Sequence, residues 1–178
     1  MGLQLPEWLT EPLSWVGLEW PQADEVKLFE AGQAWMAFAF RLQPIAAHAN
    51  SAAADVWSNN EGPASDEFKR WWEDEDGPTK RLRDDQLAAL LIGGALMIFA
   101  AITLVMKIMF IVQLIILAVQ VAMAIAAAFA TFGASTATVP GFIAATRIAL
   151  TRLIRKVVDD VIKKSIKKLL DKAKQLLK

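Results

Sequence analysis

The feature that most constrains this chain is a long run of residues with a single charge in it. Gln86 to Met106 contain no charged side chain, Lys107 follows, and the next charge is Arg147. A helix needs roughly 20 apolar residues to cross the ~30 Å core of a bilayer, and residues 87–106 and 108–130 both provide that length. The apolar residues occupy every side of such a helix, which is typical of a membrane span or of a helix covered all round by protein.

A single helix over residues 80–130 would be ~75 Å long at ~1.5 Å per residue. That is longer than one bilayer crossing, so the helix would need a partner, a second copy or another part of the protein to cover it. A turn at Lys107 would instead give two spans. The sequence VMKIMF contains no turn former there, and a charge at mid-membrane costs about 2.5–3.5 kcal/mol. We therefore favour one continuous helix.

The rest of the chain also has helical periodicity, so the sequence predicts an all-α fold. Apolar residues over 22–57 recur at steps of three and four, and Pro44 is expected to kink this helix. Turn formers occupy 58–63, and a short helix over 64–75 precedes the break at Asp76-Gly77-Pro78. Thr79 is then the predicted N-cap of the apolar helix.

The first 21 residues contain three prolines, which argue against one continuous helix. We expect one or two short helical turns whose tryptophans pack as a lid; these are Trp8, Trp15 and Trp20. The acidic start lacks the basic and apolar regions of a cleavable Sec signal. If the protein leaves the cell, we therefore expect it to use another route.

Charge is distributed unevenly between the two halves. Residues 1–85 hold 16 acidic and 7 basic side chains, a balance of −9, whereas residues 86–178 hold 3 and 12, a balance of +9. After a loop of small residues at 131–139, Pro140 suits the first turn of a strongly amphipathic basic helix over 141–178. Such a helix can lie on an anionic membrane or pack against a partner helix.

These features predict three segments within one structural unit. Residues 1–85 form a Trp-rich N-terminal segment and first helix with its turn, 86–146 a long apolar helix with the small-residue loop, and 147–178 a basic amphipathic helix. Small and weakly polar residues mark candidate contact points with a membrane or another helix. They are Gly93, Gly94, Lys107, Gln113, Gln120, Gly133 and Ser135.

The sequence offers no pattern of residues that suits catalysis. The chain has no cysteine, and His48 is the single histidine. The acidic run at 73–76 lacks the spacing of a calcium loop, and the motifs of phosphate loops, zinc sites and nucleophile elbows are absent from the sequence. The basic tail has no interleaved aromatic residues, which argues against nucleic-acid binding. We therefore expect a protein that is not an enzyme, with no catalytic residue, cofactor or metal site.

The run LSWVGLEWPQADEVKLFEAGQAWMAFA resembles the start of WXG-like N-terminal domains in actinobacterial polymorphic toxins. These are similar to the N-terminal half of a mycobacterial channel protein that carries a necrotizing toxin. The matching residues are Gly17, Trp20, Pro21, Asp24, Lys27, Leu28, Ala34 and Trp35. The Trp-x-Gly turn of the family, with its following aromatics, is matched by Trp57, Gly62, Phe68 and Trp71. Four residues separate Trp57 from Gly62, where the family has one.

The resemblance implies a WXG-like long helical hairpin that serves secretion and targeting. Such domains precede a C-terminal toxin and leave the cell through type VII (ESX) systems with small helical partners. The chain ends at Lys178, so the toxin domain is expected to be missing from it. The family's Tyr-x-x-x-Asp/Glu export signal needs a tyrosine, and this chain has none. A partner would have to supply that signal.

The sequence leaves three functional readings open. The first is a delivery domain, secreted without a Sec signal or associated with the cell envelope, whose apolar segment is covered by a partner, a second copy or another part of the protein. In a more active form of this reading, residues 87–130 insert into a target membrane to help a toxin across. The second is a small integral membrane protein with two apolar spans and a basic tail on the cytosolic side. The third is a soluble helical oligomerisation module. For the delivery domain, the expected partners are a helical secretion protein or a second copy of the chain, and the type VII machinery.

Overall fold

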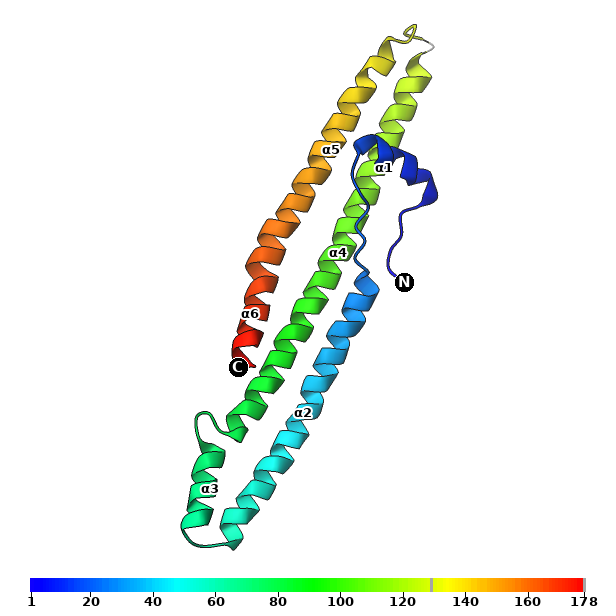
Figure 1. The fold of residues 1–178 in the computed structure, drawn as a ribbon. Coiled ribbons are helices and arrows are strands. Elements are labelled where there is room, and N and C mark those ends of the chain that lie inside the picture. Colours follow the sequence, from blue (N-terminus) through cyan, green and yellow to red (C-terminus); the bar gives the residue numbers. More distant parts are fainter. Residues whose placement is uncertain (129, 178) are drawn as a thin grey trace. The chain divides into compact units, whose positions relative to one another are not determined.

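Every regular element in the described part of the chain is helical, as the sequence predicted. The computed structural model describes residues 1–128 and 130–177 (Figure 1). Phe129 and Lys178, which fall in the predicted apolar helix and basic tail, lie outside the described residues. The elements in chain order are the short 3-10 helix η1 (Glu7–Leu9), α1 (Thr10–Val16), α2 (Glu25–Asn59), α3 (Pro63–Glu73), α4 (Pro78–Ala128), the 3-10 helix η2 (Ala134–Thr138), α5 (Val139–Lys156), the π-helix η3 (Val157–Ile166) and α6 (Lys167–Leu176).

The long apolar helix is continuous. α4 runs through Lys107 without interruption, so the turn that would divide it into two membrane spans is not formed. α2 likewise continues through Pro44. The N-cap prediction for Thr79 was wrong, because α4 begins one residue earlier, at Pro78. Proline suits the first turn of a helix, where its missing N–H has no partner to lose.

The chain divides into two compact units. Unit 1 comprises Met1–Lys27 and Phe99–Lys164, and unit 2 comprises Leu28–Ile98 and Ser165–Lys178. Both α2 and α4 contribute residues to each unit. The segments predicted from the sequence, 1–85, 86–146 and 147–178, were drawn from changes in amino-acid composition, whereas the two units are defined by contacts in space. The division into these segments stays a prediction.

In unit 1, α5 runs back alongside α4, and the N-terminal segment with η1 and α1 packs against them (Figure 1). The turn between α4 and α5 is held by Ser135, whose hydroxyl donates to the carbonyl oxygen of Ala124 at 2.7 Å. Each large apolar side chain buried here stabilises the fold by about 1.5–3 kcal/mol. The core consists of Leu9, Val16, Phe110, Leu114, Leu117, Val121 and Leu150.

The N-terminal segment covers this core, but with different residues from those predicted. Leu9 and Val16 are fully buried. Trp8 and Trp15 are 59% and 37% exposed, so they do not form the expected lid. Trp20 alone of the three packs inward. On a short helix, the aliphatic residues at the correct spacing reach the core and leave the flanking tryptophans outside.

In unit 2, α2 and the first part of α4 form an antiparallel hairpin, and α3 folds back beside the end of α2 (Figure 1). The buried apolar residues of this hairpin are small, which allows the helix backbones to approach closely. They are Ala39, Ala53, Ala88, Ala89 and Ala95. The hairpin confirms the predicted fold class.

Candidate functional site

The interior of unit 1 contains an ion pair between two residues that are 82 positions apart in the sequence. The Nζ atom of Lys107 donates to the Oε2 atom of Glu25 at 2.8 Å, and the two side chains are 2% and 8% exposed. Losing one partner of such a pair leaves a buried charge uncompensated, which costs about 3–5 kcal/mol. Lys107 therefore lies at a helix interface inside the protein, between α4 and the start of α2.

Glu25 also binds the extended N-terminal segment of the chain. Its Oε1 atom accepts a hydrogen bond from the backbone amide of Leu3, and Gly2 packs so closely that a Cβ atom there would lie 2.6 Å from Oε2. Burial raises the pKa of the Glu25 carboxyl, but the hydrogen bonds from Leu3 and Lys107 outweigh it and hold the pKa below its ordinary value. The carboxylate thus ties three segments of unit 1 together.

Trp20 covers the ion pair. Its ring meets Phe110 edge-on, with centroids 6.1 Å apart and planes at 88°, and the Lys107 ammonium lies 5.9 Å from the Trp20 centroid. A cation at this distance is attracted to the ring face. Thr103, one turn before Lys107, is also buried. The first tryptophan of the predicted family motif therefore shields a buried charge.

Asp24 caps α2. Its Oδ1 atom accepts hydrogen bonds from the amides of Val26 at 3.0 Å and Lys27 at 3.1 Å. The bond from the Lys27 amide is the main cause that holds the pKa of Asp24 below its ordinary value. Asp24 therefore satisfies free amides of the first turn of α2 and places a negative charge at the positive end of the helix dipole.

The remaining residues of the N-terminal motif have different surroundings. Gly17 ends α1 with φ of 66°, a left-handed conformation that favours glycine. Pro21 and Leu28 are half-buried, and Lys27 is exposed. Ala34 and Trp35 line an open apolar groove on α2 together with Phe38, whose ring meets Trp35 edge-on at 6.1 Å. Trp35 and Phe38 are 39% and 49% exposed, so this groove is a surface that a partner could cover.

The four residues of the predicted family turn lie together between α2 and α3. Trp57 and Trp71 both pack against Phe68, with centroids 5.9 Å from its ring. Gly62 precedes α3 with φ of 117°. The aromatic cluster therefore holds α3 against the end of α2, even though the spacing from Trp57 to Gly62 differs from that of the family.

The sequence did not predict the hydrogen bonds that Asn50 makes with Trp72 and Thr79. The Oδ1 atom of Asn50 accepts hydrogen bonds from the indole of Trp72 at 2.9 Å and from the hydroxyl of Thr79 at 3.2 Å. One amide on α2 thus fixes the end of α3 and the first turn of α4. The one available signal was a polar residue placed beside the apolar stripe of α2.

The predicted interface residues divide into helix contacts and a turn. Gly93 lies against Gly32 on α2, whereas Gly94 faces open space. Gln113 lines a groove between α4 and α5, and Gln120 is half-buried. Gly133 and Ser135 belong to the turn between those helices, where Gly133 has φ of 89°. The contacts described for Gly93, Gln113 and Ser135 are thus made with other residues of the same chain.

The described residues do not assemble a metal or catalytic cluster. Within that part of the chain, no three His, Asp or Glu side chains come together in a way that could hold a metal ion. His48 is exposed beside Pro44 and Ile45 on the surface of α2. Two helical stretches, Pro63–Ala128 and Ala134–Leu176, are long and apolar enough to cross a membrane by length and composition alone.

Comparison with known proteins identifies one family. The family model described as "WXG100 like domain" matches residues 4–148. That span includes the N-terminal cap, the α2–α4 hairpin with its aromatic turn, and the buried ion pair. No curated protein and no solved structure matches the chain.

Proposed function

The chain belongs to the family of WXG100-like domains, and from that premise we propose that it is a non-enzymatic secretion and delivery domain for a type VII system. The observation that carries the proposal is the α2–α4 hairpin closed by the aromatic turn at Trp57, Phe68 and Trp71. It lies within the residues that the family model matches. Membership of the WXG100-like family suggests a helical protein related to type VII secretion.

The proposal includes a helical partner or a second copy of the chain. Trp35 and Phe38 on α2 present exposed aromatic surface in an open groove, and aromatic residues are enriched at the centres of protein interfaces. Since the chain has no tyrosine, a partner would provide the tyrosine-based export signal found in related substrates. The type VII machinery would then recognise the complex.

The cargo is proposed from the resemblance to actinobacterial polymorphic toxins and to the mycobacterial channel protein. Domains of that kind stand before a C-terminal toxin, so we propose that this chain delivers such a toxin after export without a Sec signal. The apolar helix α4 supports a membrane step during delivery. Residues 87–128 supply the length that such a step requires.

The test is export from an actinobacterial host with its type VII system intact or deleted. We expect the chain in the culture filtrate of the intact strain and only in cells of the deleted strain. A variant with Trp57→Ala and Gly62→Ala should stay in the cells, because it disturbs the hairpin turn. A control variant, Trp8→Ala, changes an exposed tryptophan outside the turn and should be exported normally. Equal export from both strains would refute the proposal.

A further inference from the structure

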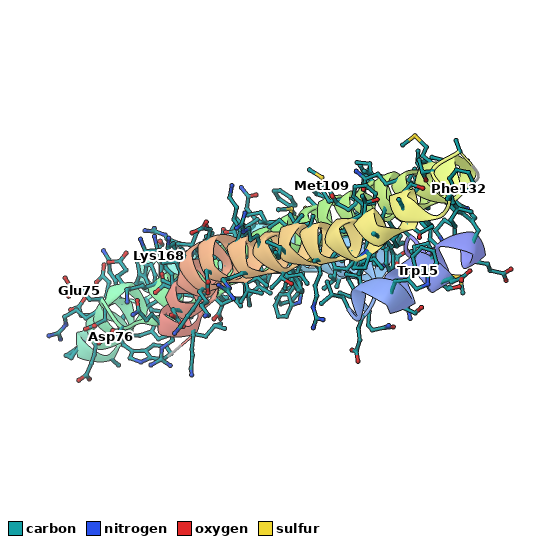
Figure 2. The ribbon with its side chains drawn as sticks, turned by 90° about the horizontal axis from the view of Figure 1, so that it is seen from above. Trp15, Glu75, Asp76, Met109, Phe132 and Lys168 are labelled. Atoms are coloured by element: carbon teal, nitrogen blue, oxygen red, sulfur yellow. The ribbon has the colours of Figure 1, made fainter. Side chains whose placement is uncertain are left out.

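Within unit 1, the two sides of α4 differ in exposure. One side contributes Phe110, Leu114 and Leu117 to the core. The other side is an exposed apolar face whose residues share one side of the helix by its 3.6-residue period: Val105, Ile108, Met109, Val112, Ile115, Ile116, Val119 and Met123. Figure 2 shows Met109 projecting from this side of the helix. From Val105 to Met123 the face is ~27 Å long, close to the ~30 Å core of a bilayer.

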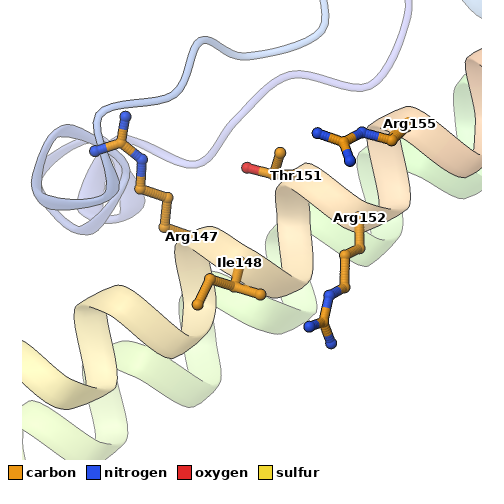
Figure 3. A pocket seen from close by; sticks show the side chains of 5 residues that line it. All are labelled: Arg147, Ile148, Thr151, Arg152 and Arg155. Carbon is orange, nitrogen blue, oxygen red and sulfur yellow. The ribbon is translucent and has the colours of Figure 1, made fainter.

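The face of α4 contains no charged residue, but the neighbouring helix is strongly basic. On α5, Arg147, Thr151 and Arg155 follow one another at four-residue steps, and Arg152 lies on the adjacent row beside Ile148. These five residues line an open groove of about 270 Å³. In Figure 3, Arg147, Thr151 and Arg155 lie on one side of α5, and Arg152 extends from the other.

The arginines of this groove are available to an external anion. None of the ion pairs formed among the described residues involves Arg147, Arg152 or Arg155. The two acidic residues of η3 pair instead with the lysines one turn later, Asp159 with Lys163 and Asp160 with Lys164, each at 2.8 Å. Guanidinium groups bind phosphate oxygens through two parallel hydrogen bonds.

A second groove joins the basic row to the apolar face. It has a volume of about 300 Å³ and is lined by Met109 and Gln113 of α4 and by Ala149, Arg152, Leu153 and Lys156 of α5. Its walls are mainly apolar, with two cations at one edge. Arg152 lines both grooves. A ligand that has a phosphate and a hydrocarbon chain could bind both grooves at once, with its phosphate at the arginines and its hydrocarbon chain on the apolar walls.

We propose that α5 and the exposed face of α4 form a binding surface for anionic phospholipid. The lipid phosphate binds Arg152 and Arg155, and the acyl chains lie along Met109 and Val112. The match between the uncharged length of α4 and the bilayer core favours lipid over a protein partner, and the adjacent arginines select an anionic headgroup. The inference rests on the membrane step of the proposed function and names its ligand and its site.

The first test is flotation of the purified chain with vesicles. We expect binding to phosphatidylcholine vesicles that contain phosphatidylglycerol, and weaker binding to phosphatidylcholine alone. The variant Arg152→Gln/Arg155→Gln should bind anionic vesicles roughly tenfold more weakly or worse. The matched control Lys167→Gln/Lys168→Gln removes the same charge from exposed positions on α6, which do not line either groove, and should weaken binding less than the arginine variant does. Equal loss in both variants would overturn the site, since only overall charge would then matter.

The second test addresses the apolar face and the source of the phosphate. The variant Val112→Asn/Ile116→Asn should weaken binding to vesicles while circular dichroism shows an unchanged helical content. If it instead dissolves a dimer and leaves vesicle binding intact, a second copy covers the face and the proposal fails. Displacement from vesicles by millimolar inorganic phosphate at constant ionic strength would also overturn it, because the groove would then bind a free anion.

Export separates this inference from the proposed function. The Arg152→Gln/Arg155→Gln variant should still reach the culture filtrate through the type VII system, since the hairpin turn is untouched. Weak vesicle binding with normal export supports the lipid site. Normal vesicle binding by the wild-type chain without type VII export would refute the secretion role and leave the lipid site standing.

Discussion

Gly32 on α2 and Gly93 on α4 lie backbone against backbone. A Cβ atom added to either glycine would lie 2.9 Å from the carbonyl oxygen of the other. Real Cβ atoms do not approach backbone oxygens this closely, so a substitution at either position has to move a helix. The contact sets the distance between the two helices of the hairpin in unit 2.

Alanine at Gly93 should therefore destabilise the protein, and alanine at Gly94 should not. We expect Gly93→Ala to lower the free energy of unfolding by about 1–3 kcal/mol through overpacking. Gly94 has open space around its Cβ position, so Gly94→Ala should raise the stability by up to ~1 kcal/mol through helix propensity. Chemical denaturation followed by circular dichroism measures both. Similar effects in the two variants would contradict the close contact.

The pair Gly93-Gly94 shows what the sequence could and could not predict. Both glycines were predicted as contact points, and only the partner helix distinguishes them, because the contact depends on how α2 lies against α4. The helices themselves were predictable from apolar periodicity and from prolines and glycines at their ends. The same limit explains the missed partner of Lys107: Glu25 is remote in sequence, and its pairing follows from packing that no local pattern encodes.

Removing one member of the Glu25–Lys107 pair should lower the free energy of unfolding more than removing both members. Lys107→Met or Glu25→Leu leaves one buried charged group without its partner, and we expect either change to lower the free energy of unfolding by about 3–5 kcal/mol. The double variant Lys107→Met/Glu25→Leu should recover part of that loss, since it removes both polar groups. A double-mutant cycle of unfolding free energies gives the coupling energy. Additive losses would show that the two side chains do not depend on each other.

Charge reversal at Lys107 distinguishes a protein interface from a membrane boundary. Lys107→Glu places two carboxylates within the buried site and should lower the melting temperature markedly. Binding to anionic vesicles should not respond as long as the variant stays folded, since Lys107 is 2% exposed and its ammonium faces Glu25. Flotation of the folded variant at low temperature measures this. Weaker flotation without a loss of stability would place Lys107 at the lipid instead.

Acidic pH should destabilise unit 1, because it protonates the Glu25 carboxylate. The folded-state pKa of Glu25 is held below its ordinary value of 4.5, so its contribution to stability is complete above that value. It declines as the pH falls through the folded-state pKa, because the unfolded chain takes up the proton first. Unfolding free energies between neutral pH and about pH 3 should fall more steeply for the wild type than for Glu25→Gln. Glu30→Gln, which removes an exposed carboxylate from the same helix, should keep the wild-type slope.

The tryptophans and arginines mark a second limit of sequence reasoning. Trp8, Trp15 and Trp20 have similar local contexts beside prolines, yet only Trp20 reaches a buried partner, because Phe110 lies opposite it. The basic helix was predicted as a whole, but the groove at Arg152 was not. That groove needs Met109 and Gln113 of α4 beside α5, and residues so far apart become neighbours only through the antiparallel packing.

The Asn50 side chain should be more important to stability than its half-exposed position suggests. It accepts hydrogen bonds from Trp72 and Thr79, and each is worth about 1 kcal/mol. Asn50→Ala should cost about 1–3 kcal/mol, and Trp72→Phe, which keeps an aromatic ring but removes the indole N–H, should cost less. Both variants should loosen α3, seen as faster hydrogen exchange over residues 63–77. Unchanged exchange there would mean that the aromatic cluster alone holds α3.

The turn between α2 and α3 should unfold cooperatively with the hairpin when Trp57 and Gly62 are changed. Trp57→Ala removes the ring that packs on Phe68 and should cost about 1–3 kcal/mol, since Trp57 is only half-buried. Gly62→Ala places a side chain at φ of 117° and should cost a further ~1–3 kcal/mol of backbone strain. Thermal unfolding by circular dichroism should show a lower midpoint for each variant and the lowest for the double variant.

Trp71 is 57% exposed, so the control variant Trp71→Ala should shift the unfolding midpoint less than Trp57→Ala does. If all these midpoints coincide with the wild type, the aromatic turn does not hold the hairpin, and the basis for assigning an export role to it is lost.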